Sequence, residues 1–439
     1  MKTEIKQRIA QLNNGEIPNG YKKTSVGIVP IEWAEHTLGD IFKFKNGLNK
    51  EKEAFGQGTP IVNYTDVWKK RGLKAKDIKG RVVLSKNEIQ NYEAKCGDVF
   101  FTRTSETIDE IGYSSVLLED IENAVFSGFV LRARPYNNLV SREYHQYCYS
   151  EPLMRQEIIK RSSMTTRALT SGPMLSQVAI NLPSHREQSK IAEILMKWDE
   201  AIELYNQYIE KLKQLKSIWL KKMFPKKGER VPEWRFKGFT DAWEQRKLGE
   251  LVDRVVRKNT NNESTLPLTI SAQYGLVDQI TYFNNRVASR DVSNYYLVLN
   301  GEFAYNKSTS DGYPFGAVKR LDLYEKGVLS TLYIVFAPKK EQQIDSDYLT
   351  VFFDTDRWHK GVAERAAEGA RNHGLLNISA EDFFDIDLSV PKDIVEQKQI
   401  GAFIRQLDNL ITLHQCKVEK IKAQQKVLQK YLLNGIVRV

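Results

Sequence analysis

Histidine and cysteine are scarce in this sequence, and the few that it has form no metal-binding pattern. The three cysteines, Cys96, Cys148 and Cys416, are odd in number and include no Cys-x-x-Cys pair, so neither a disulfide framework nor a zinc ribbon is supported. The six histidines are scattered, and no His-Glu-x-x-His motif joins two of them. We therefore expect no metal site in this chain.

Several catalytic motifs are also missing. The chain has no Gly-x4-Gly-Lys-Ser/Thr loop that would hold nucleotide phosphates, and no convincing glycine-rich cofactor loop. The Asn/Asp-Pro-Pro-Tyr/Phe motif of amino-methyltransferases is absent as well. We therefore predict that the chain has no catalytic residues, binds no cofactor of its own and is not itself an enzyme.

Long hydrophobic runs are the third absence. The longest, such as residues 333–337, cannot span a bilayer, and the first residues lack the apolar core of a secretory signal. We expect a cytoplasmic protein without membrane contact. Its 439 residues are 41% hydrophobic, which gives room for two or three folded domains.

Basic residues outnumber acidic residues in this sequence. The 65 Lys and Arg residues against 55 Asp and Glu residues give a formal net charge of +10. Basic side chains neutralise phosphates and release counterions, so this excess favours a polyanionic partner such as double-stranded DNA. Charge alone does not decide the matter, because many basic proteins bind no nucleic acid.

An internal repeat organises the sequence. The segment Pro183-Ser-His-Arg-Glu-Gln-Ser-Lys-Ile191 is matched near the end by Pro391-Lys-Asp-Ile-Val-Glu-Gln-Lys-Gln-Ile400. Each consists of a proline, a short loop, Glu-Gln and the apolar start of a helix. The segments that follow repeat at the offset that separates Ile191 from Ile400.

Apolar positions in both segments alternate in steps of four and three residues. The first seam consists of Ile191, Leu195, Trp198, Ile202, Tyr205, Ile209, Leu212, Lys216, Trp219 and Met223, and the second of Ile400, Ile404, Leu407, Ile411, His414, Val418, Ile421, Gln425, Leu428 and Leu432. Even the polar break recurs, since Lys216 matches Gln425. The pattern predicts two coiled-coil helices, each presenting a narrow seam to a partner helix. Their length disfavours the alternative of two ordinary amphipathic core helices.

The regions before the two helices repeat more faintly. Trp33-x4-Leu-Gly-Asp40 parallels Trp243-x4-Leu-Gly-Glu250, and residues 97–103 parallel residues 301–307, whereas the stretches between these anchors diverge. Short β-branched or aromatic runs predict strands at residues 98–102, 115–118, 129–132, 295–299 and 332–336. The clearest helical signals cover residues 144–160 and 348–367.

We therefore predict an α/β fold of the α+β kind, with two mixed α/β domains, two long antiparallel coiled-coil helices and a pseudo-two-fold internal repeat. The antiparallel arrangement follows if the ends of the second domain lie close together, as domain termini often do. The two domains would then sit at opposite ends of a rod on the order of 55 Å long. The predicted segments are 1–28, 29–183 (first domain), 184–225 (central helix), 226–240 (basic linker), 241–391 (second domain) and 392–439 (C-terminal helix).

These repeated motifs resemble the specificity subunits of type I restriction–modification systems. The resemblance rests on the Trp-x4-Leu-Gly-Asp/Glu start of each domain and the Pro…Glu-Gln-x-x-Ile start of each helix, and it covers essentially the whole chain. It implies two target recognition domains, each contacting one half of a bipartite, asymmetric DNA site. It also implies that the two helices set the spacer between the half-sites.

The resemblance further implies partners that carry the catalysis. These are two modification subunits with adenine methyltransferase activity and S-adenosylmethionine, and restriction subunits that use ATP and Mg²⁺ for translocation and cleavage. Two other functions are left open by the residues. A DNA-binding adaptor or scaffold without methyltransferase partners is the main alternative, and a stand-alone nuclease or methyltransferase is disfavoured by the missing motifs.

Candidate DNA-binding side chains lie in polar loops that differ between the two domains. Arg and Lys reach guanine, Asn and Gln reach adenine, and Ser, Thr and amides position phosphates. Arg103 and Lys307 are the strongest candidates, because each ends a predicted strand, although a solvated surface charge is the simpler interpretation of any one cation. The full set is Lys69, Lys70, Arg71, Thr102, Arg103, Thr104, Arg161 and Arg167 in the first domain and Gln273, Tyr274, Asn306, Lys307, Ser308, Arg365, Arg371 and Asn372 in the second.

Overall fold

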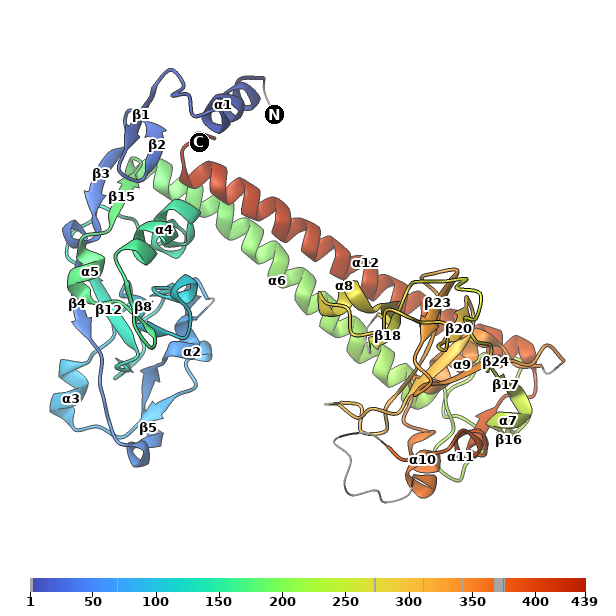
Figure 1. Ribbon diagram of the computed structural model, residues 1–439. Helices are drawn as coiled ribbons and strands as arrows, with labels where there is room; N and C mark the ends of the chain where they lie inside the picture. The colour runs from blue at the N-terminus through green and yellow to red at the C-terminus, as the bar shows by residue number, and fades with distance from the viewer. Residues whose placement is uncertain are drawn as a thin grey trace. The chain divides into compact units, whose positions relative to one another are not determined.

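Contacts between residues divide the chain into two compact units. The computed structural model describes residues 3–68, 70–271, 274–310, 312–341, 343–366, 374 and 376–439. Unit 1 comprises Met1–Tyr205 and Lys417–Val439, and unit 2 comprises Asn206–Cys416. Two long helices, α6 (His185–Lys222) and α12 (Ile394–Leu433), each begin in one unit and end in the other (Figure 1). The segments predicted from the sequence separate these helices from the two domains. The contacts instead assign about half of each helix to unit 1 and the other half to unit 2.

The seam residues pair α6 with α12 in antiparallel order. In unit 1, Lys417 lies 4.8 Å from the ring centre of Tyr205. In unit 2, the rings of Tyr208 and His414 are 4.8 Å apart, and those of Trp219 and Phe403 are 5.4 Å apart. Moving forward along α6 therefore means moving backward along α12. Every seam position is buried or half-buried, as expected of a coiled-coil stripe, and the predicted antiparallel helices are confirmed.

The Glu-Gln pair at the start of each helix has the same role in both copies. The side-chain oxygen of Gln188 accepts a hydrogen bond from the backbone N–H of Ser141, and its Nε2 donates to the carbonyls of Leu139 and Pro183. Gln397 likewise accepts from the N–H of Asp345 and donates to two carbonyls. Both glutamines are buried. Each amide therefore satisfies three backbone groups that would otherwise be left unpaired where the helix meets its globular part.

The globular part of unit 1 is built on a five-stranded sheet. Its order is β4-β12-β8-β10-β6, and all four residues of β8 are buried in the core. Smaller sheets pair β11-β5-β7, β13-β14-β9, β15-β3 and β1-β2. The strands are β1 Tyr21–Thr24, β2 Gly27–Pro30, β3 Ala34–Thr37, β4 Phe42–Asn46, β5 Phe55–Val62, β6 Gly72–Leu73, β7 Arg81–Val82, β8 Val99–Thr102, β9 Thr104–Ser105, β10 Ser114–Leu117, β11 Val125–Phe126, β12 Val130–Pro135, β13 Ser163–Met164, β14 Ala168–Leu169 and β15 Ala179–Leu182.

The globular part of unit 2 repeats this plan. The order β17-β24-β21-β22 matches β4-β12-β8-β10, and the pair β16-β25 matches β3-β15. Trp33 and Trp243, at the start of the two copies, are both almost fully buried and act in packing. The strands are β16 Glu244–Lys247, β17 Val252–Arg254, β18 Leu268–Ser271, β19 Gly275–Asp278, β20 Tyr296–Leu299, β21 Phe303–Asn306, β22 Ala317–Arg320, β23 Lys326–Leu329, β24 Ile334–Pro338 and β25 Asp387–Val390.

Short helices complete the two globular parts, and two of the predicted helices are broken. Residues 144–160 form two 3-10 turns and then α4, because Pro152 starts a new helix and holds Glu151 in an extended conformation. The helix predicted over residues 348–367 is interrupted after α9, at Asp354, which binds two lysines, and residue 367 lies outside the described residues. The remaining α-helices are α1 Thr3–Asn13, α2 Tyr64–Val67, α3 Lys86–Asn91, α4 Pro152–Lys160, α5 Gly172–Ser176, α7 Leu248–Leu251, α8 Gln279–Phe283, α9 Ser346–Phe353, α10 His359–Arg365 and α11 Ala380–Phe384.

The N-terminal segment packs against the C-terminal tail within unit 1. Arg8 donates from Nη1 to the carbonyl of Ile436 at 2.6 Å, and the Tyr21 hydroxyl donates to the carbonyl of Gly435 at 2.5 Å. Gly435 has a φ of +64°, and a Cβ there would lie 2.5 Å from the ring of Pro30. A larger residue would therefore be both strained and crowded. The tail is held closely by the hairpin β1-β2 (Figure 1).

Candidate nucleic-acid interface

The repeated strands β8 and β21 end in the two strongest candidates from the sequence. Arg103 follows β8 and its carbonyl accepts from the N–H of Thr170, while Lys307 follows β21 and its carbonyl accepts from the N–H of Leu376, each at 3.0 Å. Both side chains are half-buried. Each makes one long hydrogen bond of 3.4 Å to a backbone carbonyl, which leaves other N–H groups of each cation available.

In unit 1 the structure brings two of the predicted loops together. The small sheet β13-β14-β9 places Thr104 directly beside Leu169, in the segment that contains Arg161 and Arg167. Arg103 is anchored at the same edge, because its N–H donates to the carbonyl of Phe129 at 3.0 Å. These segments, far apart in the sequence, are thus joined at the end of β8, and we call this edge surface 1.

Exposed apolar side chains on surface 1 were missed by sequence reasoning. The side chain of Phe129 is 59% exposed and that of Met164 is 52% exposed. Apolar side chains of this kind contact the methyl group of thymine in the major groove. The sequence offered one signal for Phe129, since it begins a predicted strand between two turns, but nothing marked its side chain as pointing outward.

In unit 2 the loop after β21 is joined to the segment before α11. Thr309 donates from its N–H and its hydroxyl to the carbonyl of Gly374, at 2.6 and 2.9 Å. The side-chain oxygen of Asn306 accepts from the N–H of Ser308 at 3.0 Å, which leaves the amide group of Asn306 as a donor. We call this edge, with Asn306, Lys307 and Ser308, surface 2.

Tyr274 lies elsewhere in unit 2, beside a broad depression. Its side chain is 56% exposed, and together with Tyr313 it lines one side of an open cavity of about 840 Å³. Lys216 and Asp408 of the two long helices line the same cavity. Tyr274 therefore faces the junction between globular part and helices.

Other predicted site residues are engaged within the protein. The side-chain hydroxyl of Thr102 is fully buried and accepts from the N–H of Tyr113 at 2.9 Å, so Thr102 belongs to the framework behind surface 1. The Arg71 guanidinium binds Asp199 at 3.0 Å and Gln429 at 2.8 Å, on the long helices. Both side chains are therefore held by contacts within unit 1.

Four exposed or half-exposed cations have partners within the same globular part. Lys70 pairs with Asp77 at 3.3 Å, Arg167 with Glu106 at 3.0 Å, and Arg365 with Asp385 at 2.6 Å, while Arg161 donates to the Gln177 amide at 2.9 Å. The hydrogen bond to Asp385 raises the pKa of Arg365. Such surface pairs are weak and exchange readily with phosphate. Lys69, Gln273, Arg371 and Asn372 lie outside the residues that the structure describes.

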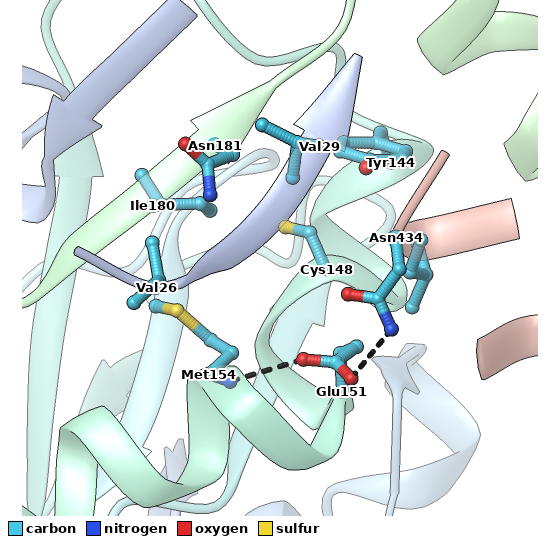
Figure 2. Close-up of a pocket in the computed structure, with 10 residues that line it drawn as sticks. Val26, Val29, Tyr144, Cys148, Glu151, Met154, Ile180, Asn181 and Asn434 are labelled. Carbon is cyan, nitrogen blue, oxygen red and sulfur yellow. Dashed lines mark hydrogen bonds between the residues drawn. The ribbon is translucent and has the colours of Figure 1, made fainter. Parts of the chain in front are cut away.

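One small cavity in unit 1 lies beside the hairpin β1-β2. The space between the hairpin β1-β2, α4 and the end of α12 is about 30 Å³, enough for roughly one water. Figure 2 shows Glu151 at its base, accepting from the N–H of Met154 at 3.1 Å and from the Asn434 amide at 2.9 Å. The buried thiol of Cys148, whose pKa burial raises, faces the same space. This space is a packing defect closed by a structural carboxylate.

No group of three or more His, Cys, Asp and Glu side chains among the described residues is placed so that it could hold a metal ion. No helix in the described ranges is long and apolar enough to cross a membrane.

Comparisons with known proteins match the repeat. The family described as "Type I restriction modification DNA specificity domain" matches residues 30–214 and again residues 241–423. The specificity subunit of the type I restriction enzyme MjaVIII from Methanocaldococcus jannaschii is 22% identical over 433 residues, covering 94% of each chain.

Solved structures show the same fold. The crystal structure of a type I restriction–modification S subunit from M. genitalium has a TM-score of 0.55 at 14% identity, over 95% of this chain and 97% of that one. A chain from a structure on complex assembly and conformational transition of the type I system has a TM-score of 0.52 at 14% identity, over 93% and 99%. The chain thus belongs to the family of type I restriction–modification DNA specificity subunits and carries two copies of its domain.

Proposed function

We propose that this chain reads a bipartite, asymmetric double-stranded DNA site, with one half-site contacted by each unit. The observation that carries the proposal is the repeated strand end. Arg103 and Lys307 occupy matching positions after β8 and β21, and each is joined to a second loop through its carbonyl. The scaffold is the same in the two units, whereas the loop residues differ, so the two halves of the site would differ in sequence.

The side chains at these edges suit base and phosphate contacts. Surface 1 offers Arg103 with the exposed Phe129 and Met164, and surface 2 offers the amide of Asn306 beside Lys307. Guanidinium and ammonium groups reach guanine, amides reach adenine, and apolar groups reach the thymine methyl. The net charge of +10 favours binding to the phosphate backbone.

The two long helices are the proposed spacer between the half-sites. Each is continuous from one unit into the other, and the seam that pairs them is the most regular part of the repeat. A helix advances about 1.5 Å per residue and DNA about 3.4 Å per base pair, so helix length converts directly into a number of unread base pairs.

The chemistry is assigned to partner subunits. We propose that two modification subunits, each using S-adenosylmethionine, methylate adenine at the site, and that restriction subunits use ATP and Mg²⁺ to translocate and cut DNA in the cytoplasm. The sequence of this chain has neither the Gly-x4-Gly-Lys-Ser/Thr loop that holds nucleotide phosphates nor the Asn/Asp-Pro-Pro-Tyr/Phe motif of amino-methyltransferases. A base inside a duplex must be turned out into a pocket before it is methylated, and that work falls to the modification subunits.

Methylome sequencing of a host with and without the gene tests this function. We expect one methyl-adenine motif to disappear with the gene, and that motif to consist of two different half-sites separated by a fixed number of unspecified bases. Loss of a contiguous motif would overturn the bipartite assignment. If no motif changes and the chain never co-purifies with a methyltransferase-sized subunit, the function as a partner of modification subunits is wrong.

A further inference from the structure

Each seam is interrupted by a polar residue that lies in a network with the globular part of its unit. In unit 2, the Lys216 ammonium lies 2.8 Å from Asp354 of the globular part and 2.7 Å from Asp408 of α12. Lys319, from β22, lies 2.8 Å from the other oxygen of Asp354. Two cations and two anions thus alternate across the boundary between helices and globular part. We call these four residues joint 2.

The matching position in unit 1 is the centre of a second network. Gln425, the counterpart of Lys216, donates to Asp199, the counterpart of Asp408, at 2.7 Å. Asp199 also binds Arg71 at 3.0 Å and the hydroxyl of Tyr147 at 2.7 Å, and both of these come from the globular part. We call Arg71, Tyr147, Asp199, Gln425 and its neighbour Gln429 joint 1.

Gln429 extends joint 1 to a second contact with the globular part. Its side-chain oxygen accepts from Arg71 Nη2 at 2.8 Å, and its Nε2 donates to the hydroxyl of Ser150 at 2.8 Å. The Arg71 guanidinium also lies over the ring of Tyr147, 5.1 Å from its centre. The Arg71 guanidinium therefore binds Asp199 and Gln429 through its N–H groups while its plane lies over the Tyr147 ring. A planar guanidinium can make these contacts together, whereas an ammonium group cannot.

Stability of the helix pair does not explain these networks. An apolar side chain at a seam position stabilises a coiled coil at least as well as a polar one, and polar residues there are best attested as devices that select one geometry. The joints are also partly buried, since the side chains of Lys216 and Asp354 are each 17% exposed. Hydrogen-bonded ion pairs are directional, whereas apolar contacts allow neighbouring surfaces to slide.

We propose that joints 1 and 2 are positioning residues that hold each globular part in one orientation on the helix pair, and thereby determine how many base pairs may separate the two half-sites. This inference rests on the proposed function. One additional base pair moves a half-site by about 3.4 Å and turns it by roughly 35°. A globular part that is fixed on the helices rejects that displacement, and one that can tilt accepts it.

The test for joint 2 is the substitution Lys216→Gln. It gives the seam of α6 the same residue type that α12 has at the matching position, Gln425. The seam keeps a residue that it already tolerates, while the bridge between Asp354 and Asp408 is lost. The full-length variant is expressed with its modification subunits in a host free of methylation, and methylation is read at sites whose spacer is native, one base pair longer or one shorter. We expect discrimination between native and altered spacers to fall about tenfold, within the range of couplings in polar networks, with both half-sites unchanged.

The matched control is Lys213→Gln. Lys213 is exposed and pairs with Glu210 of its own helix, at 2.7 Å, so the same chemical change there should leave spacer discrimination as in the wild type. Equal methylation ratios across the three spacers in wild type and Lys216→Gln would overturn the role of joint 2. A proportional loss of methylation at every spacer would also overturn it, because that result indicates a destabilised chain.

Arg71→Lys provides an independent test in unit 1. The lysine keeps the charge but cannot bind Asp199 and Gln429 together, so spacer discrimination should again fall while half-site preference is kept. Arg142→Lys is the control, because Arg142 is an exposed residue paired with the adjacent Glu143 at 3.2 Å. A changed base preference in Arg71→Lys would mean that Arg71 contacts DNA, and would overturn its place in the joint.

Failure of the proposed function is distinguishable from failure of this inference. If the wild-type complex methylates a contiguous motif, the bipartite function itself is wrong. If the wild-type motif is bipartite and both Lys216→Gln and Arg71→Lys keep the native spacer discrimination, only the role of the joints is wrong.

Discussion

Gln425 of α12 donates a hydrogen bond from Nε2 to Oδ1 of Asp199 in α6 at 2.7 Å, at the one seam position of unit 1 where a glutamine replaces an apolar residue. In the other copy the matching residues are Lys216 and Asp408, 2.7 Å apart. The repeat has therefore preserved the position of a polar contact while exchanging a neutral donor for a charged one. Both contacts reach into the globular part of their unit, so the same positions also mark where helices and globular part are joined.

Arg103→Ala should relax sequence preference in one half-site only. Arg103 ends β8 at surface 1 and retains free N–H groups, and a good arginine–guanine contact contributes about 1–3 kcal/mol of discrimination. Competition binding against single-base variants of both half-sites measures the effect. Lys307→Ala is the matched variant and should affect the other half-site. Equal weakening on every sequence would show that Arg103 contacts phosphate.

Adding one heptad to both long helices should lengthen the spacer and leave the half-sites unchanged. Insertions beside Tyr208 and His414, which face each other, keep the seam in register and avoid both joints. Seven residues add about 10 Å, or about three base pairs. Methylome sequencing of the variant reports the new spacer. An unchanged spacer would refute the proposal that helix length sets the spacer. As a control, a two-residue insertion breaks the seam and should destabilise the chain.

Gln188→Ala should destabilise unit 1 by about 1–3 kcal/mol, because it leaves buried backbone groups of Ser141, Leu139 and Pro183 without their partner. Urea unfolding measures the loss. Gln397→Ala should have a similar effect in unit 2. Gln424→Ala is the control, since Gln424 is exposed on α12, and its stability should remain within about 0.5 kcal/mol of the wild type. A similar loss in the control would contradict a special role for the buried amides.

Acidification should weaken the ion pairs of joint 2. Burial raises the pKa of the Asp354 carboxyl, but the ammonium groups of Lys319 and Lys216 outweigh this effect, so its pKa in the folded chain lies below the ordinary value of an aspartate. A carboxyl with a lowered folded-state pKa contributes stability that is present above its unfolded pKa and is lost as the pH falls through the folded value. The stabilisation from Asp354 should therefore begin to decline near pH 4, the unfolded-state pKa, and be lost as the pH falls through the lower folded-state pKa.

Asp354→Asn separates this contribution from general acid unfolding. At pH 6 the variant should be less stable than the wild type, because two partly buried lysines lose an anionic partner. The difference should narrow as the pH falls from 4 towards 3. Burial raises the pKa of Asp408, against the effect of Lys216. Asp408 is therefore protonated at a higher pH in the folded chain than in the unfolded chain, which opposes the acid-induced loss of stability in both proteins. Urea unfolding at each pH measures both chains, and a constant difference would contradict the assignment.

Much of the architecture followed from periodicity in the sequence. The four-three spacing predicted two coiled-coil helices, because only side chains at that spacing share one face of a helix. Every predicted seam position, from Ile191 to Leu432, is buried or half-buried. The strand predictions around Phe101 and Val335 were also confirmed, since alternating or continuous apolar runs between turns are local signals. The interruptions of the predicted helices were not predicted: the helix ends after Phe353, where Asp354 binds Lys216 and Lys319 from distant parts of the sequence.

The candidate interface was only partly visible in the sequence. Its anchor points, Arg103 and Lys307, were found because the repeat aligned two strand ends. The exposure of Phe129 and Met164 depends on which strands lie next to each other, and no local pattern carries that information. Arg71 illustrates the same limit: its residue type fits a base contact, yet the fold places it against Asp199.

The sequence by itself determined that there are two copies of one unit, that the helices carry a seam, and that each seam has a polar break. Those features depend on the order of residues along a single helix or strand. Only the tertiary structure decided what the breaks do, since Lys216 meets Asp354 and Gln425 meets Asp199 across large sequence separations. The physical reason is that a buried polar group must find its partner wherever the folded chain supplies one.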